Sequence, residues 1–212
     1  MATMIDNKSA EYYGEQKVWE YFQKLLSDDV IVYNTREVLG KEYDFCLLLK
    51  NKGIIIVEVK GWNANGMKVE SPDKIYLSGN DEPLGSPKKQ ARTYKFCMIK
   101  KIQNDLGFVP LVMDMVCYPF IDKDTYYKVG LNIVSEEECT ILANDFETSN
   151  ALNNKLERCY SLFNSIPHSY FTDDKMMRIR QKMEPTFAVG NNSGTNLLPY
   201  SKLTISPNKL ED

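Results

Sequence analysis

Histidine is almost missing from this sequence, since His168 is the only one among 212 residues. Hydrolases with a serine or cysteine nucleophile usually activate it with a neighbouring histidine. A single histidine in the loop-like residues 166–169 argues against such a triad within one chain. We interpret His168 as a surface or capping residue.

Paired cysteines are missing as well. The five cysteines are odd in number and widely spaced, without a Cys-x-x-Cys pair: Cys46, Cys97, Cys117, Cys139 and Cys159. This pattern suggests neither a zinc site nor a disulfide framework. Most of them lie in apolar runs, so we expect buried thiols that act as small hydrophobic side chains.

Long apolar runs and an excess of positive charge are also absent. No run approaches the ~20 residues that span a bilayer, and the N-terminal residues lack the apolar centre of a signal peptide. We therefore expect a cytoplasmic protein. The net charge of −3 provides no global attraction to nucleic acid, so any polyanion would bind a local patch.

The most informative stretch contains two short apolar runs, at residues 45–49 and 54–57, separated by residues 50–53. Each run is too short for a typical helix and is rich in aliphatic side chains, which predicts a β-hairpin. Gly53 suits the left-handed position of a three-residue loop formed by residues 51–53.

The loop length decides which side chains of the hairpin meet. A loop of residues 51–53 pairs Lys50 with Ile54, which puts Asp44 opposite Lys60 and diagonal to Glu58 on one face. A two-residue loop would turn Asp44 to the other face. We expect the first register because of the position of the glycine.

Two carboxylates and an ammonium group at one strand end point to a hard divalent cation. Mg²⁺ takes oxygen ligands and commonly binds one or two carboxylates together with a substrate phosphate. Asp44 and Glu58 would hold the metal, and Lys60 would orient a water or neutralise developing charge. This is the chemistry of phosphodiester hydrolysis. The alternative is a structural ion pair of Glu58 with Lys60 at a solvated strand end.

Residues 7–27 have a helical period, with Ser9 as a suitable N-cap. Their apolar stripe comprises Tyr12 or Tyr13, Val18, Trp19, Phe22, Leu25 and Leu26. Glu15 flanks this stripe, so it either points at the sheet or is an ordinary exposed glutamate. Gly14 costs about 1 kcal/mol against alanine within a helix, which suggests a close approach by another segment.

The rest of the chain completes an α/β fold. We expect an edge strand at residues 29–38, a helix from Ser86 to about residue 104, and a buried central strand at 109–118. A strand, a helix and a strand in this order imply a crossover and a parallel pairing, hence a mixed central β-sheet flanked by helices.

The C-terminal half predicts additions to this core. We expect, in order, a strand at 128–134, a helix N-terminus at Ser135, and helices at 150–164 and 172–184. Residues 185–212 are rich in Asn, Ser, Gly, Thr and Pro, as in a linker or a disordered tail. The chain would therefore comprise one domain, residues 1–184, and a tail.

One ordered set of residues resembles a known family. The set comprises Gly14, Glu15, Val18, Asp44, the run 56–62, Ser86, Pro87, Gln90 and Ala91. It is similar to the NERD, or nuclease-related, domain of the PD-(D/E)xK restriction-endonuclease-like superfamily, over roughly residues 10–120. Two features depart from the pattern: no proline precedes Asp44, and the segment between Lys60 and Ser86 matches nothing in it.

The resemblance implies an αβββαβ core and a nuclease that depends on Mg²⁺ or Mn²⁺. Glu15, Asp44 and Glu58 would be the metal ligands, with Lys60 as the catalytic cation. Gln90 would face the sheet and hydrogen-bond a phosphate or the attacking water. The opposite side of the same helix, which would face solvent, carries Lys88, Arg92 and Lys95.

The resemblance also implies nucleic acid, in the first place DNA, as the partner. It suggests a role in DNA processing or antiviral defence, with a fused or partner helicase, since domains of this family are often joined to helicases. A homo-oligomer is equally compatible with the sequence. The alternative function is a catalytically inactive nuclease-like module that binds nucleic acid or serves as a scaffold.

Overall fold

A mixed sheet of six strands forms the centre of the computed structural model, which describes residues 1–5, 12–165 and 170–184. In spatial order the strands are β1 (Thr3–Ile5), β2 (Val30–Val38), β3 (Lys41–Leu49), β4 (Gly53–Val59), β7 (Val112–Tyr118) and β8 (Thr140–Leu142). β2, β3 and β4 form an antiparallel meander, whereas β1, β7 and β8 each join a neighbour in parallel. A separate hairpin consists of β5 (Lys68–Ser71) and β6 (Lys74–Tyr76).

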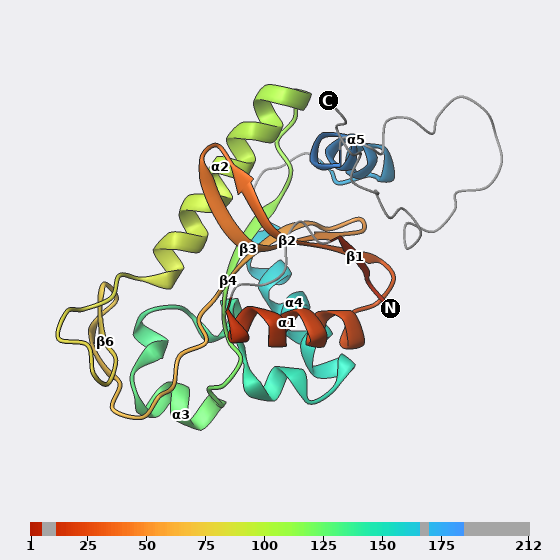
Figure 1. The fold of residues 1–212 in the computed structure, drawn as a ribbon. Coiled ribbons are helices and arrows are strands. Elements are labelled where there is room, and N and C mark those ends of the chain that lie inside the picture. Colours follow the sequence, from red (N-terminus) through yellow and green to blue (C-terminus); the bar gives the residue numbers. More distant parts are fainter. Residues whose placement is uncertain (6–11, 166–169, 185–212) are drawn as a thin grey trace, which may run out of the picture.

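Helices cover both faces of the sheet (Figure 1). α1 (Tyr13–Leu25) and α4 (Ser149–Phe163) pack on one face, and α2 (Pro87–Leu106) and α5 (Asp173–Met183) pack on the other. The remaining helices of the described residues are α3 (Lys123–Lys128) and three short 3₁₀ helices, Leu131–Ile133, Glu137–Cys139 and Ala143–Phe146. The order α1-β2-β3-β4-α2-β7 is the predicted αβββαβ core, and the expected α/β fold with a mixed sheet is confirmed.

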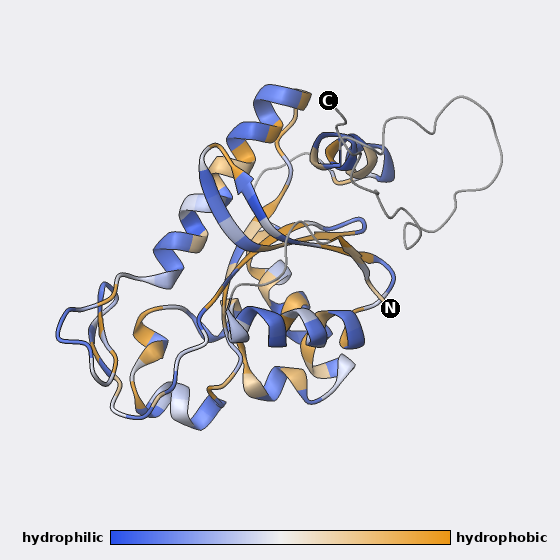
Figure 2. Ribbon diagram, viewed as in Figure 1, coloured by the Kyte–Doolittle hydropathy of each residue, from blue (hydrophilic) through white to orange (hydrophobic). Residues whose placement is uncertain are grey.

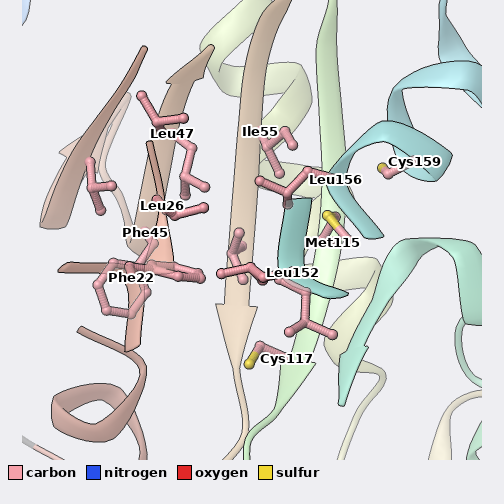
Figure 3. Packing of buried hydrophobic residues seen from close by; sticks show 14 of the residues in the cluster. Phe22, Leu26, Phe45, Leu47, Ile55, Met115, Cys117, Leu152, Leu156 and Cys159 are labelled. Carbon is pink, nitrogen blue, oxygen red and sulfur yellow. The ribbon is translucent and has the colours of Figure 1, made fainter. Parts of the chain in front are cut away.

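The strands form because their sequences are apolar on both sides. Every residue of β4 and of β7 is buried, as expected for central strands with helices on both faces. The central part of the sheet is accordingly largely orange in Figure 2, whereas the far end of the β2–β3 hairpin and much of α2 are blue. Figure 3 shows how Phe22 of α1, Leu26 directly after it and Leu152 of α4 pack on the strands. Each fully buried side chain of this kind contributes roughly 1.5–3 kcal/mol.

The turn between β3 and β4 differs from the predicted loop. Leu49 pairs with Gly53, and the Lys52 N–H donates to the Leu49 carbonyl at 3.1 Å, so the loop is residues 50–52. Asn51 takes the left-handed position with φ 60°. Gly53 instead begins β4 with φ 147°, where an added Cβ would lie 2.4 Å from the Leu111 carbonyl oxygen. The predicted pairing of Lys50 with Ile54 is therefore wrong by two residues, which leaves each side chain on its predicted face.

Helix α2 is rotated relative to the prediction. The basic side chains expected in solvent are partly inside: Lys88 is 5% exposed, and its Nζ lies 2.9 Å from Oδ2 of Asp114 on β7. Nζ of Lys95 lies 2.9 Å from Oδ1 of the same carboxylate, and only Arg92 is exposed as predicted. Gln90, expected to face the sheet, is exposed. The ion pairs with Asp114 offset part of the cost of burying two lysines, and they fix the rotation of the helix on the sheet.

Other elements also differ from expectation. Residues 128–134 form the end of α3 and a 3₁₀ turn instead of a strand, and Glu137–Cys139 is a 3₁₀ turn before β8. β2 is not an edge strand, because β1 pairs with it. The helices predicted at 86–104, 150–164 and 172–184 are confirmed as α2, α4 and α5, capped by Ser86, Thr148 and Thr172. Ser9, His168 and residues 185–212 lie outside the described residues.

The cysteines behave as predicted. All five lie within the described residues and are free thiols, four of them buried and Cys97 half-buried. None of the helices in residues 12–165 and 170–184 is both long and apolar enough to cross a membrane.

Candidate active site

The predicted acidic residues meet on neighbouring strands, on the face of the sheet that α2 covers. The pairing of Phe45 with Val57, extended by one residue, puts Asp44 directly opposite Glu58. Phe45 and Val57 point toward α1, so the alternation along a strand turns the two acidic residues toward α2. Asp44 and Glu58 were predicted to lie diagonally across the two strands, and they are instead directly opposite each other.

Each carboxylate is held by a separate hydrogen bond. The backbone N–H of Val59 donates to Oδ2 of Asp44 at 2.6 Å, which ties β3 to the end of β4. Nζ of Lys60 donates to Oε1 of Glu58 at 2.6 Å. The Glu58 side chain is 6% exposed and the Lys60 side chain 22% exposed, so solvent reaches the pair from the lysine side.

Burial makes both carboxyl groups weaker acids, and the charge of Asp44 adds to this effect at Glu58. Burial, then the neighbouring Asp44 carboxylate, raises the pKa of Glu58 to about 7, although Lys60 opposes this. Burial also raises the pKa of Asp44, against the lowering effects of the Val59 N–H and Lys60. Two carboxylates that disfavour their charged forms in this way would both gain from a nearby cation.

Helix α1 begins beside this pair. Gly14 approaches Gly61, the residue after Lys60, so closely that a Cβ on Gly14 would lie 2.8 Å from the Gly61 Cα. This confirms the close approach predicted for Gly14. Glu15 follows in the first turn of α1 and is near enough to Glu58 to raise its pKa further.

Tyr94 of α2 also faces the site, although the sequence alone did not single it out. Burial, followed by the charges of Glu58, Asp44 and Glu42, raises the pKa of Tyr94 to about 12. Its hydroxyl is therefore protonated at neutral pH and can donate a hydrogen bond. The available signal was its position one helical turn after Gln90, which puts the two residues on the same side of the helix.

The family model of the nuclease-related domain, NERD, matches residues 10–119. The chain belongs to this family. Its sheet and helices are those of a restriction-endonuclease-like nuclease fold, and Glu15, Asp44, Glu58, Lys60 and Gln90 all fall within the matched range. Neither a curated protein nor a solved structure matches the chain.

The nuclease-related domain brings together some of the predicted site residues and not others. Asp44, Glu58 and Lys60 are in contact or adjacent, Glu15 lies within electrostatic range, and Gln90 is on the exposed side of α2. Within the described part of the chain, no group of three or more His, Cys, Asp or Glu side chains is close enough to hold a metal ion. Two carboxylates suffice for Mg²⁺, which usually keeps several waters and a substrate phosphate.

Proposed function

We propose that this protein is a divalent-metal-dependent nuclease that hydrolyses phosphodiester bonds, with DNA as its substrate. One observation carries the proposal: Asp44 and Glu58 face each other on β3 and β4, with Nζ of Lys60 2.6 Å from Glu58. Membership of the nuclease-related family supports the same chemistry. Roles in DNA processing or antiviral defence, and a fused or partner helicase, are proposed from the family alone.

The donor set fits Mg²⁺ or Mn²⁺. Asp44 and Glu58 offer carboxylate oxygens that repel each other in a buried setting, and Glu15 is the nearest further carboxylate that affects Glu58. A hard cation bound there would supply Lewis-acid stabilisation of phosphate charge and a water of lowered pKa. Asp44 and Glu58 would be the ligands, with Glu15 reaching them directly or through water.

The side chains around the carboxylates have distinct tasks in this proposal. Lys60, held by Glu58, orients the attacking water or neutralises charge that develops on the phosphate. The pKa of Tyr94 is raised to about 12, so its hydroxyl stays protonated. In this proposal the hydroxyl donates a hydrogen bond to a charged group at the site. Gln90, one turn earlier and exposed, is placed to contact a substrate strand rather than the metal.

The test is cleavage of linear and circular duplex DNA, single-stranded DNA and RNA in Mg²⁺, Mn²⁺ or EDTA. We expect metal-dependent cutting that falls by about 10²-fold or more in Lys60→Ala, the size of effect seen when one charge-stabilising group is removed. Lys52→Ala is the matched control, since Lys52 lies at the other end of the same hairpin and binds Glu157.

Two outcomes would contradict the proposal. Wild-type cleavage by folded Asp44→Ala, Glu58→Ala or Lys60→Ala would rule out the mechanism. Nucleic-acid binding that is unchanged in EDTA, with no cleavage and no heat of Mn²⁺ binding by calorimetry, would instead establish the inactive binding or scaffold module.

A further inference from the structure

An exposed pair of stacked aromatic rings lies beside the candidate active site. The rings of Tyr13, the first residue of α1, and Phe120, which follows β7, have centroids 5.5 Å apart and planes inclined by 8°. Tyr13 is 70% exposed and Phe120 is 43% exposed. The apolar stripe of α1 was predicted to include Tyr12 or Tyr13, but both are exposed, Tyr12 by 64%. The outward side of Tyr13 is thus open to solvent.

The contact between α1 and β4 fixes this aromatic pair next to the catalytic strand end. Gly14 follows Tyr13 and packs against Gly61, which follows Lys60. Phe120 closes the same contact, because its Cε2 would lie 3.6 Å from a Cβ placed on Gly61. Figure 1 shows α1 starting beside the lower end of β4, near α3. A strand of nucleic acid with a phosphate at Asp44 and Glu58 would lie at the same end of β4 as these rings.

We propose that the aromatic pair, Tyr13 and Phe120, stacks against an unpaired base of single-stranded nucleic acid bound at the active site. This inference rests on the proposed nuclease function and names its substrate class. Every base has a π-face, so stacking on an aromatic ring binds single strands without requiring a particular sequence. A base inside a duplex is already stacked on both sides and cannot reach the ring.

The charge of the protein favours base contacts over phosphate contacts as the source of affinity. The chain has a net charge of −3, and two of its carboxylates, Asp44 and Glu58, lie at the site itself. Phosphate contacts give a steep dependence on salt, with a slope near −0.7 per contact on single strands, because each contact releases counterions. Stacking of a base on a ring neutralises no phosphate and so adds nothing to this slope. We therefore expect binding that weakens only modestly as salt rises.

The size of the patch argues for a base rather than a protein as the occupant. A specific protein partner usually covers about 800 Å² on each side. Two side chains cannot provide that area, but one ring face is about the size of a nucleobase. The position directly beside Lys60 also connects the pair to the proposed chemistry.

The test measures binding by fluorescence anisotropy in Ca²⁺ and in EDTA. The probes are a labelled single-stranded oligothymidylate, the same oligonucleotide with abasic central positions, and a blunt hairpin duplex. We expect wild-type protein to prefer the base-bearing strand over the abasic strand by about 5- to 150-fold for each stacked base. Tyr13→Ala and Phe120→Leu should lose this preference, and Tyr13→Phe should keep it.

One control variant and two parallel measurements accompany this test. Tyr170→Ala removes an equally exposed ring, 63% exposed and ahead of α5, and should bind as wild type does. Phe120→Leu retains an apolar side chain against Gly61, and circular dichroism melts would verify that each variant is folded. Cleavage is followed in parallel, so that loss of chemistry and loss of stacking are seen separately.

The inference is overturned if folded Tyr13→Ala and Phe120→Leu keep the wild-type ratio between base-bearing and abasic strands. It is equally overturned if the blunt duplex binds as tightly as the single strand, or if no oligonucleotide binds. If wild-type protein prefers the base-bearing strand, the two variants lose that preference, and no protein cleaves with metal, the aromatic pair is supported and the proposed nuclease function is contradicted.

Discussion

The backbones of Gly14 and Gly61 touch, so that a Cβ on Gly14 would come within 2.8 Å of the Gly61 Cα. This contact joins the first turn of α1, which carries Glu15, to the residue after Lys60. Two glycines are needed because a side chain on Gly14 would push the helix away from the strand end. The contact therefore sets the distance between Glu15 and the Asp44–Glu58 pair.

Gly14→Ala should lower both stability and activity. Overpacking costs about 1–3 kcal/mol, and this loss should exceed the roughly 1 kcal/mol that alanine gains within a helix. We expect a lower urea midpoint and weaker Mn²⁺ binding by calorimetry. Gly85→Ala is the control, because nothing lies within 4 Å of a Cβ at that position. A Gly14→Ala protein more stable than wild type would show that the contact is not close-packed.

Asp114→Asn should destabilise the protein strongly. Asp114 is 1% exposed and pairs with both Lys88 and Lys95, so the substitution removes the buried carboxylate beside two ammonium groups. Lys88 then keeps only its longer pair with the exposed Glu136, at 3.8 Å. Breaking a buried pair of this kind costs about 3–5 kcal/mol, measurable by urea unfolding. Asp105→Asn breaks the exposed pair with Lys101 on the same helix and should cost under about 1 kcal/mol. Equal losses in the two variants would argue against the buried charge network.

Stability without metal should fall as pH rises through the range in which Glu58 ionises. The pKa of Glu58 is raised from 4.5 to about 7, so between these values the folded protein holds a proton that the unfolded chain has released. The unfolding free energy therefore decreases from pH 4.5 to 7 by up to about 3 kcal/mol from this group. Urea unfolding in EDTA should show this decrease for wild type and a flatter profile for Glu58→Gln. Parallel profiles for the two proteins would contradict the raised pKa.

Tyr94→Phe should reduce cleavage by about 10- to 100-fold, the effect of one lost hydrogen bond to a charged group. The pKa of Tyr94 is raised to about 12, so the pH–rate profile between pH 6 and 9 should keep its shape. Single-turnover rates across that range provide the measurement. Tyr127→Phe, which removes an exposed hydroxyl bound to Glu137, is the matched control and should cut normally. A changed profile in Tyr94→Phe would mean that the hydroxyl titrates during the reaction.

The sequence was sufficient to predict the face of the sheet that carries the site. Side chains alternate between the two faces of a strand, so a shift of the pairing by an even number of residues leaves each side chain on the same face. Asp44 and Glu58 share a face in the predicted register and in the observed one, although the pairing moved by two residues. The error arose because glycine is the usual left-handed residue, whereas Asn51 takes that role here and Gly53 makes room for the Leu111 carbonyl.

The orientation of α2 could not be predicted from the helix alone. Lys88 and Lys95 resemble a solvated face until Asp114, on a strand formed later in the chain, provides the buried counter-charge. The short strands β1 and β8 were missed because three residues carry no detectable period. Tyr94 was not recognised as a site residue, since its proximity to Glu58 depends on how the helix packs on the sheet.

The two faces of the sheet are built on different principles. Under α1 and α4 the core consists of aliphatic, aromatic and sulfur-containing side chains such as Phe22, Met115 and Leu152 (Figure 3). Under α2 the sheet also carries Asp114, which pairs with Lys88 and Lys95, and Glu58, which pairs with Lys60. Apolar side chains of similar volume replace one another at small cost, whereas one half of an ion pair cannot change alone. Over evolutionary time, the first face can drift one residue at a time, while the second must change in coupled pairs.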